Sequence, residues 1–192
     1  MIAILKYNAG NVASVENAIK RLGYQTVVTN DATLLKSAAK VIFPGVGEAS
    51  SAMNYLMEIG LDEVIKTLEQ PVLGICLGMQ LMCQHSEEGN TKGLGIFKTK
   101  VLKFPPRDLV PHIGWNNFTS VQGMLFENCQ PQNNCYFLHS YYADICDETV
   151  AVNDYILPFS AALQKDNFYA TQFHPEKSGQ NGLQILQNFL NI

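Results

Sequence analysis

Two short segments of this 192-residue chain carry side chains that can act together as a nucleophilic site. In the first, Cys76 stands between Gly74 and Gly78 at the end of an apolar run. Glycines two residues on either side of a nucleophile are typical of a sharp strand–turn–helix elbow, which holds the side chain out at the end of a sheet. The second segment ends on His174 and Glu176. A thiol, an imidazole and a carboxylate are the parts of a nucleophilic triad, so the chain is predicted to be an enzyme.

The spacing also predicts a role for each of these groups. At an elbow, Cys76 meets the amino end of the following helix, whose dipole and free N–H groups favour a thiolate. The N–H of Leu77 is then placed to bind an oxyanion. His174 and Glu176 stand two apart on a segment that reads as a strand, where such side chains share a face. We therefore expect Glu176 to accept an N–H of His174 and to turn the other ring nitrogen toward Cys76.

A glycine-rich loop, Pro44 to Gly47, follows another apolar segment. By itself such a loop is a plain turn. Beside a nucleophile elbow in the same sheet, the loop is a candidate for the second oxyanion donor, through Val46 and Gly47. Cys83 is expected two turns further along the elbow helix as a packing residue.

Three other histidines have no predicted part in the chemistry. His85 is expected near the end of the elbow helix as a capping or surface residue. His112 and His139 are interpreted as packing residues.

Hydrophobic periodicity divides the chain into a first half of alternating strands and helices and a second half of short strands. Strands are predicted at 2–5, 25–28, 41–43 and 71–73, the last running into the elbow at 74–78, and helices at 12–22, 33–37, 50–56 and 61–68. Later strands are predicted at 100–104, 115–118, 136–138, 161–164 and 168–172, before a closing helix at 182–190. Repeated strand–helix units indicate a parallel sheet with helices on both faces, with ligands at the carboxyl ends of its strands. The expected fold is α/β and flavodoxin-like, an open parallel or mixed sheet plus a small antiparallel portion, in one domain of residues 1–192.

Composition narrows the classes of partner. The formal charge is −4, hydrophobic residues make up 47% and charged residues 16% of the chain. This balance is typical of a globular protein and argues against nucleic acid or an anionic membrane as the main partner. No apolar run reaches the roughly 18 residues of a spanning helix, and no signal peptide is evident, so we expect a cytoplasmic protein. The five cysteines show no zinc-site spacing, and we expect neither a metal nor a cofactor.

The segments 74–80 and 173–176 resemble the class I glutamine amidotransferases. Four further segments, at 44–47, 111–116, 136–141 and 174–178, resemble more narrowly the glutaminase subunits of imidazole glycerol phosphate synthase. The matching segments run in family order over nearly the whole chain. One difference lies in the first loop, where Lys6 and Asn8 replace the aspartate and glycine of a common family pattern.

The resemblance implies hydrolysis of glutamine to glutamate and ammonia by Cys76, His174 and Glu176 through a glutamyl thioester. It implies substrate contacts at Gly45 and Gln80, and through the backbone of Ser140 and Tyr141. It also implies a heterodimer with the cyclase subunit, which is a (β/α)8 barrel that receives the ammonia and makes imidazole glycerol phosphate in histidine biosynthesis. The residues that match positions near that interface are Asn11, His112, Trp115, Tyr136 and Lys177.

Three alternatives remain open from the sequence. One is a glutaminase that serves another synthase, such as anthranilate or pyridoxal phosphate synthase, although the segment 111–116 counts against it. A second is a hydrolase of the same fold that acts on γ-glutamyl peptides. The third is a non-catalytic flavodoxin-like binding module, which an intact set of Cys76, His174 and Glu176 disfavours.

Overall fold

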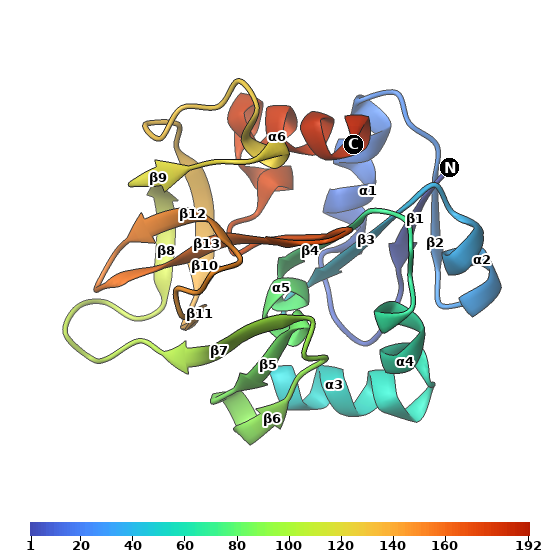
Figure 1. The fold of residues 1–192 in the computed structure, drawn as a ribbon, viewed down its shortest axis with the longest axis horizontal. Coiled ribbons are helices and arrows are strands. Elements are labelled where there is room, and N and C mark those ends of the chain that lie inside the picture. The colour runs from blue at the N-terminus through green and yellow to red at the C-terminus, as the bar shows by residue number, and fades with distance from the viewer.

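The computed structural model describes residues 1–192, and a twelve-stranded mixed sheet runs through the whole molecule (Figure 1). Five neighbouring strands are parallel, in the order β2 (Thr26–Thr29), β1 (Ile2–Leu5), β3 (Lys40–Gly45), β4 (Val72–Cys76) and β14 (Phe168–Thr171). The carboxyl ends of these strands therefore meet at one edge of the sheet, as the alternating pattern predicted.

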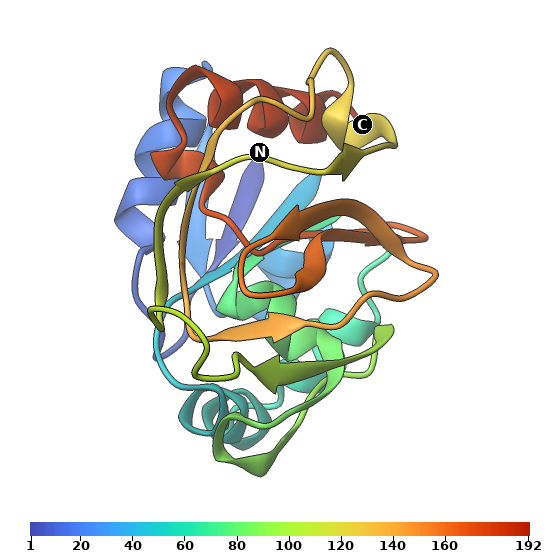
Figure 2. The ribbon, with the colours of Figure 1, turned by 90° about the vertical axis from the view of Figure 1, so that its left-hand side faces the viewer.

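Beyond β14 the sheet becomes mainly antiparallel. It continues through β13 (Pro158–Lys165), β11 (Tyr141–Ala143), β7 (Phe97–Lys103), β5 (Cys83–Ser86) and β6 (Thr91–Lys92). A branch leaves the sheet at β13, where β12 (Thr149–Asp154) pairs with β13 and β9 (Ser120–Val121) pairs with β12. A separate two-stranded sheet pairs β8 (His112–Asn116) with β10 (Cys135–His139). In the view of Figure 2 this second sheet stands beside the carboxyl-end edge of the parallel strands. The expected α/β fold with an antiparallel portion is confirmed.

Helices cover both faces of the parallel strands, because side chains alternate across each strand. Ala3 and Leu5 of β1 face one core with the helices α2 (Ala32–Ser37), α3 (Ala49–Glu58) and α4 (Leu61–Lys66). Ile2 and Ile4 face the other core with α1 (Val12–Arg21) and α6 (Gly179–Asn191). None of the helices combines the length and the apolar character needed to cross a membrane.

The structure corrects several local predictions. The elbow helix α5 (Leu77–Met82) ends earlier than expected, and Cys83 begins strand β5 instead of continuing that helix, although it is buried as predicted. His85 also lies in β5 and is half-buried. The third strand was expected to stop at Pro44 but extends to Gly45, which pairs with Cys76. Proline is tolerated there because the pairing of β3 with β1 has already ended at Ile42.

The short strands β5, β6, β9, β11 and β12 were not predicted. Each spans two to six residues and is held mainly by its neighbours in the sheet. Three 3₁₀ turns complete the chain: η1 (Glu88–Asn90), η2 (Met124–Phe126) and η3 (Pro175–Lys177).

Candidate active site

The predicted elbow exists, but its glycines serve packing and the strained residue is the nucleophile itself. β4 runs directly into α5 at Cys76, whose φ of 53° and ψ of −105° lie in a region that L-residues rarely occupy. A Cβ on Gly78 would lie 1.9 Å from the carbonyl oxygen of Phe43, and one on Gly74 would lie 2.9 Å from Sδ of Met82. The two glycines therefore let α5 lie tightly against β3 and β4, which fixes the turn that carries Cys76.

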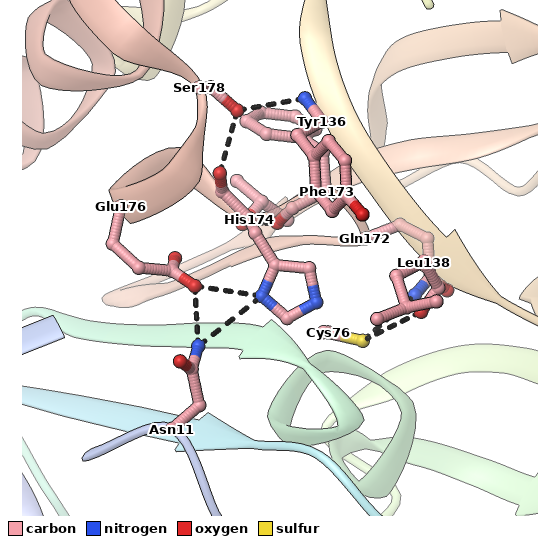
Figure 3. Close-up of polar contacts among 10 residues, drawn as sticks. Asn11, Cys76, Tyr136, Leu138, Gln172, Phe173, His174, Glu176 and Ser178 are labelled. Atoms are coloured by element: carbon pink, nitrogen blue, oxygen red, sulfur yellow. Dashed lines mark hydrogen bonds and ion pairs between the residues drawn. The ribbon is translucent and has the colours of Figure 1, made fainter. Parts of the chain in front are cut away.

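His174 and Glu176 pair as predicted, although by a different local geometry. The chain leaves β14 at Thr171, and residues 175–177 form the 3₁₀ turn η3 instead of continuing a strand. Within this turn, His174 Nδ1 lies 2.8 Å from Glu176 Oε1, and both side chains are fully buried (Figure 3). The carboxylate accepts the Nδ1 proton, which leaves Nε2 as the basic nitrogen. Nε2 has no hydrogen-bond partner in the protein.

Backbone and hydroxyl contacts hold this histidine in place. The N–H of His174 donates to the carbonyl of Tyr136 at 2.9 Å. The Ser178 hydroxyl donates to the carbonyl of His174 at 2.6 Å and accepts the N–H of Tyr136 at 2.9 Å (Figure 3). Tyr136 of β10 and Ser178, which precedes α6, thus fix the backbone of His174.

Asn11, which resemblance assigned to a partner interface, lies beside the triad. Its Nδ2 donates to Glu176 Oε1 at 2.5 Å and lies 3.5 Å from His174 Nδ1. The backbone of Asn11 adopts the left-handed conformation, with a φ of 75°. Asparagine tolerates this conformation better than most residues do. A second donor on the carboxylate holds Glu176 in its orientation toward His174.

The electrostatics favour the protonated form of His174. Burial lowers the pKa of His174, but the negative charge of Cys76, together with the hydrogen bond and charge of Glu176, outweighs this effect, so that the pKa is raised overall. The Cys76 thiol itself donates to the carbonyl of Leu138 at 3.8 Å. Transfer of the Sγ proton to Nε2 of His174 therefore produces an ion pair in a buried setting.

A cavity of about 270 Å³ opens next to Cys76. Its lining includes seven of the residues proposed for the site: Val46, Gly47, Cys76, Leu77, Gln80, Ser140 and Tyr141. His174 and Glu176 are buried outside this lining. Gly45 is absent from the lining too, and a Cβ there would lie 2.1 Å from the hydroxyl of Tyr7.

The candidate oxyanion loop has one backbone hydrogen bond and one residue with a positive φ. Val46 accepts the N–H of Gly10 at 3.3 Å through its carbonyl. Gly47 has a φ of +132°, a backbone conformation that residues with a side chain rarely adopt. No atom lies within 4 Å of the position that a Cβ would take at Gly47. The loop therefore needs glycine at position 47 because of its backbone conformation, and not because a larger side chain would clash.

One polar lining residue, Glu88, had no signal in the sequence. Glu88, in η1, reaches the cavity and accepts the N–H of Ala49 at 2.8 Å. Burial raises the pKa of its carboxyl group, and nearby Glu48 adds to this. His139 also lines the cavity, at the end of β10. Only the chain path that brings η1 against the start of α3 places Glu88 here, so no local pattern predicts it.

His112 and His139 are buried packing residues, as predicted, and they form a directional pair. His139 Nδ1 lies 2.7 Å from the carbonyl of Tyr141 and therefore carries a proton. His139 Nε2 then accepts from His112 Nδ1 at 3.1 Å. Burial lowers the pKa of His139 to about 3 and that of His112 to about 4, so both rings are neutral at physiological pH.

The lowered pKa values of this histidine pair predict that the folded protein loses stability in acid. A histidine that titrates near 6.5 when unfolded and near 3 when folded contributes stability above pH 6.5 that is lost as the pH falls toward the folded value. Between pH 7 and 5 the loss for one such histidine is about 2 kcal/mol. We expect His139→Gln to flatten this part of the stability profile, measured by urea unfolding at each pH. His85→Gln, outside the pair, is the control, and an unchanged slope in His139→Gln would contradict the assignment.

The remaining residues implied at an interface form a connected surface. The Trp115 side chain is 59% exposed and packs edge-on against Tyr136 at 6.0 Å between ring centroids. Lys177 Nζ lies 6.0 Å from the centre of the same tyrosine ring. His112 is buried beneath this surface and stacks on Phe137. It can support an interface but has almost no surface to offer one.

Comparisons with known proteins identify the family of this chain. Residues 3–192 match the family model for class I glutamine amidotransferases. The chain is 58% identical to the imidazole glycerol phosphate synthase subunit HisH of Bacteroides thetaiotaomicron, covering 100% of this chain and 99% of that protein. It is 46% identical to the corresponding HisH protein of Haemophilus influenzae, over 98% of this chain and 96% of that protein.

Solved structures agree on the fold. A putative GMP synthase protein from Thermoplasma acidophilum superposes with a TM-score of 0.77 at 20% identity, covering 100% of this chain and 92% of that one. The structure of PurLQS from Thermotoga maritima gives 0.75 at 15% identity, with 99% and 97% coverage. The match over nearly the whole length and the high identity to full-length relatives together show that this chain belongs to the class I glutamine amidotransferases and, among them, to the HisH subunits of imidazole glycerol phosphate synthase.

Proposed function

We propose that this chain hydrolyses the side-chain amide of glutamine with Cys76, His174 and Glu176 and supplies the ammonia to a cyclase. The observation that carries the proposal is the strained Cys76 at the mouth of a cavity, with a buried His174–Glu176 pair beside it. The cavity, about 270 Å³, suits a ligand the size of one amino acid.

The reaction follows from this geometry. His174 Nε2 takes the proton of the Cys76 thiol, and the thiolate attacks the amide carbon of glutamine. The N–H of Leu77 and an N–H of the 44–47 loop stabilise the oxyanion that forms. His174 then gives its proton to the departing ammonia, which leaves a glutamyl thioester. Water that loses a proton to His174 attacks the thioester and releases glutamate, while Glu176 holds the imidazole throughout.

The cavity also carries groups that suit the other end of glutamine. The substrate's α-ammonium needs a carboxylate, and Glu88 is the acidic side chain in the lining. Gln80, Ser140 and Tyr141 add polar side-chain and backbone groups around it. We therefore assign Glu88 to the α-ammonium and Gln80 with the backbone of residues 140–141 to the remaining polar atoms.

Replacing Glu88 should weaken substrate binding more than chemistry. Glu88→Gln keeps the shape and an acceptor for the Ala49 N–H but removes the negative charge. A hydrogen bond to a charged group contributes about 1.5–3 kcal/mol, so KM for glutamine should rise roughly 10- to 100-fold with little change in kcat. Glutamate release at varied glutamine measures both constants. Glu87→Gln, exposed and outside the cavity, is the control. An unchanged KM would remove Glu88 from the substrate site.

The partner we propose is a cyclase of the (β/α)8 barrel type, bound as a heterodimer in the cytoplasm and making imidazole glycerol phosphate. The supporting surface comprises Trp115, Tyr136 and Lys177, and Asn11 hydrogen-bonds to Glu176 of the triad. Signals from a bound partner have a short route to the catalytic carboxylate here.

The test is reconstitution. The chain should co-purify with the cyclase encoded in the same genome, release glutamate, and carry the adduct of a glutamine-like electrophile on Cys76. Association with an anthranilate or pyridoxal phosphate synthase component instead would favour another member of the superfamily. A complex that forms without labelling Cys76 or releasing glutamate would support the non-catalytic alternative.

A further inference from the structure

Gln172 is a fully buried polar residue placed between β14 and the catalytic histidine. Its backbone N–H donates to the carbonyl of Ala161 at 2.8 Å, which fixes the chain at this point. Its side-chain amide lies against the nucleophile, with Nε2 3.7 Å from Cys76 Sγ. Figure 3 shows Gln172 grouped with Cys76 and Leu138, on the opposite side of the imidazole from Asn11.

The direction of this amide follows from a backbone group that cannot flip. The carbonyl of Tyr141 accepts a hydrogen bond from Gln80 at 2.9 Å, so Gln80 must present its nitrogen there. The same nitrogen donates to Gln172 at 3.0 Å, so Gln172 must present its oxygen to Gln80. The nitrogen of Gln172 is consequently the atom that faces the sulfur.

We propose that Gln172 is a catalytic residue whose side-chain N–H donates to the Cys76 sulfur and favours the thiolate over the thiol. The carbonyl of Leu138 has the opposite preference, because it accepts only from a protonated sulfur. When the Sγ proton moves to His174 Nε2, the contact with Leu138 is lost and the N–H of Gln172 remains. Only the S–H bond breaks in this step and only the N–H bond of the imidazolium forms.

The groups around the sulfur make such a donor useful. The ionisable side chains that face Cys76 are His174 from the segment after β14 and Tyr7 from the loop after β1. Glu88 of η1, the neutral His139 of β10 and Tyr141 of β11 line the same cavity. Tyr7 is buried with an unpartnered hydroxyl, and burial followed by the charge of Cys76 raises its pKa. The one cationic group among them, His174, is the proton acceptor itself, so Gln172 supplies a second, neutral donor that stabilises the thiolate before it attacks the substrate.

The inference rests on the proposed role of Cys76 as the nucleophile, but its test needs neither glutamine nor the partner. The full chain is alkylated with iodoacetamide from pH 5 to pH 10, and mass spectrometry follows modification of the peptide that contains Cys76. The variants are Gln172→Met, which keeps much of the volume without a donor, and Gln172→Glu, which puts a carboxylate beside the sulfur. Gln84→Met and Gln84→Glu make the same changes at an exposed position of β5 and serve as matched controls.

We expect the midpoint of the alkylation profile to rise by roughly one to two pH units in Gln172→Met. The free energy of a hydrogen bond to a charged group corresponds to a pKa shift of about this size. The rise should be larger still in Gln172→Glu. The plateau rate at high pH should equal that of the wild type, since the thiolate then forms without help. General damage to the core would lower the plateau instead.

Either variant with a wild-type midpoint, or a reduced rate at every pH, would overturn the role of Gln172. A wild-type chain whose Cys76 resists alkylation throughout the range would overturn the nucleophile assignment itself. The two failures are therefore distinguishable.

Discussion

Cys76→Ala should reduce glutamate release by about 10⁴-fold or more, the loss seen when a triad nucleophile is removed. The substitution deletes only the sulfur and keeps a Cβ at the same positive φ, so the free energy of unfolding should change by no more than about 1 kcal/mol. Glutamate release in the reconstituted complex measures the first effect, and urea unfolding measures the second.

Two controls separate chemistry from structure in this experiment. Cys83→Ala removes a buried cysteine that lies at the start of β5 and should leave activity intact, although it lowers stability. With the cyclase present, Cys76→Ala should still support product formation from added ammonium at high pH, because only the ammonia source is lost. Glutamine turnover by Cys76→Ala, or an electrophile adduct on Cys83, would show that the triad is wrongly assigned.

Gly47→Val should lower the glutaminase rate of the complex by about 10²–10³-fold, the usual cost of losing one oxyanion donor. The φ of +132° at Gly47 is open to glycine alone, so a β-branched residue forces the loop into another conformation. Space is not the limit, since nothing lies within 4 Å of an added Cβ. The rotated peptide would no longer present its N–H to the oxyanion, while glutamine binding should change little.

The matched control is Gly23→Val, at the end of α1. Gly23 also has a positive φ, of +87°, and equally open surroundings, so it reproduces the backbone strain away from the site. Rates should be measured with and without the cyclase and its ligand. Full ligand-stimulated activity in Gly47→Val would exclude this loop as the element that keeps the glutaminase rate of the isolated chain low. Equally high rates in the isolated chain and in the liganded complex would exclude it too.

The sequence by itself determined the fold class and the three candidate catalytic residues, because both follow from patterns of residues that are close together in the chain. Alternating apolar segments of strand and helix length specify a parallel sheet, and Gly74 to Gly78 marks where a nucleophile leaves it. His174 and Glu176 are two residues apart, so their pairing survives even though the segment forms a 3₁₀ turn and not a strand. A short sequence separation constrains two side chains to meet in either conformation.

Tertiary structure alone decided the surroundings of the triad. Glu88 reaches the cavity because η1 packs against α3, and Asn11 reaches Glu176 across a separation of 165 residues in the chain. The elbow helix ends at Met82 because Cys83 pairs into the sheet beside Phe97, a choice that helical periodicity cannot reveal. The direction of the Gln172 amide depends on the backbone carbonyl of Tyr141, two hydrogen bonds away. Such contacts join residues that are distant in sequence, and their geometry is set by how the strands pack and not by any local preference.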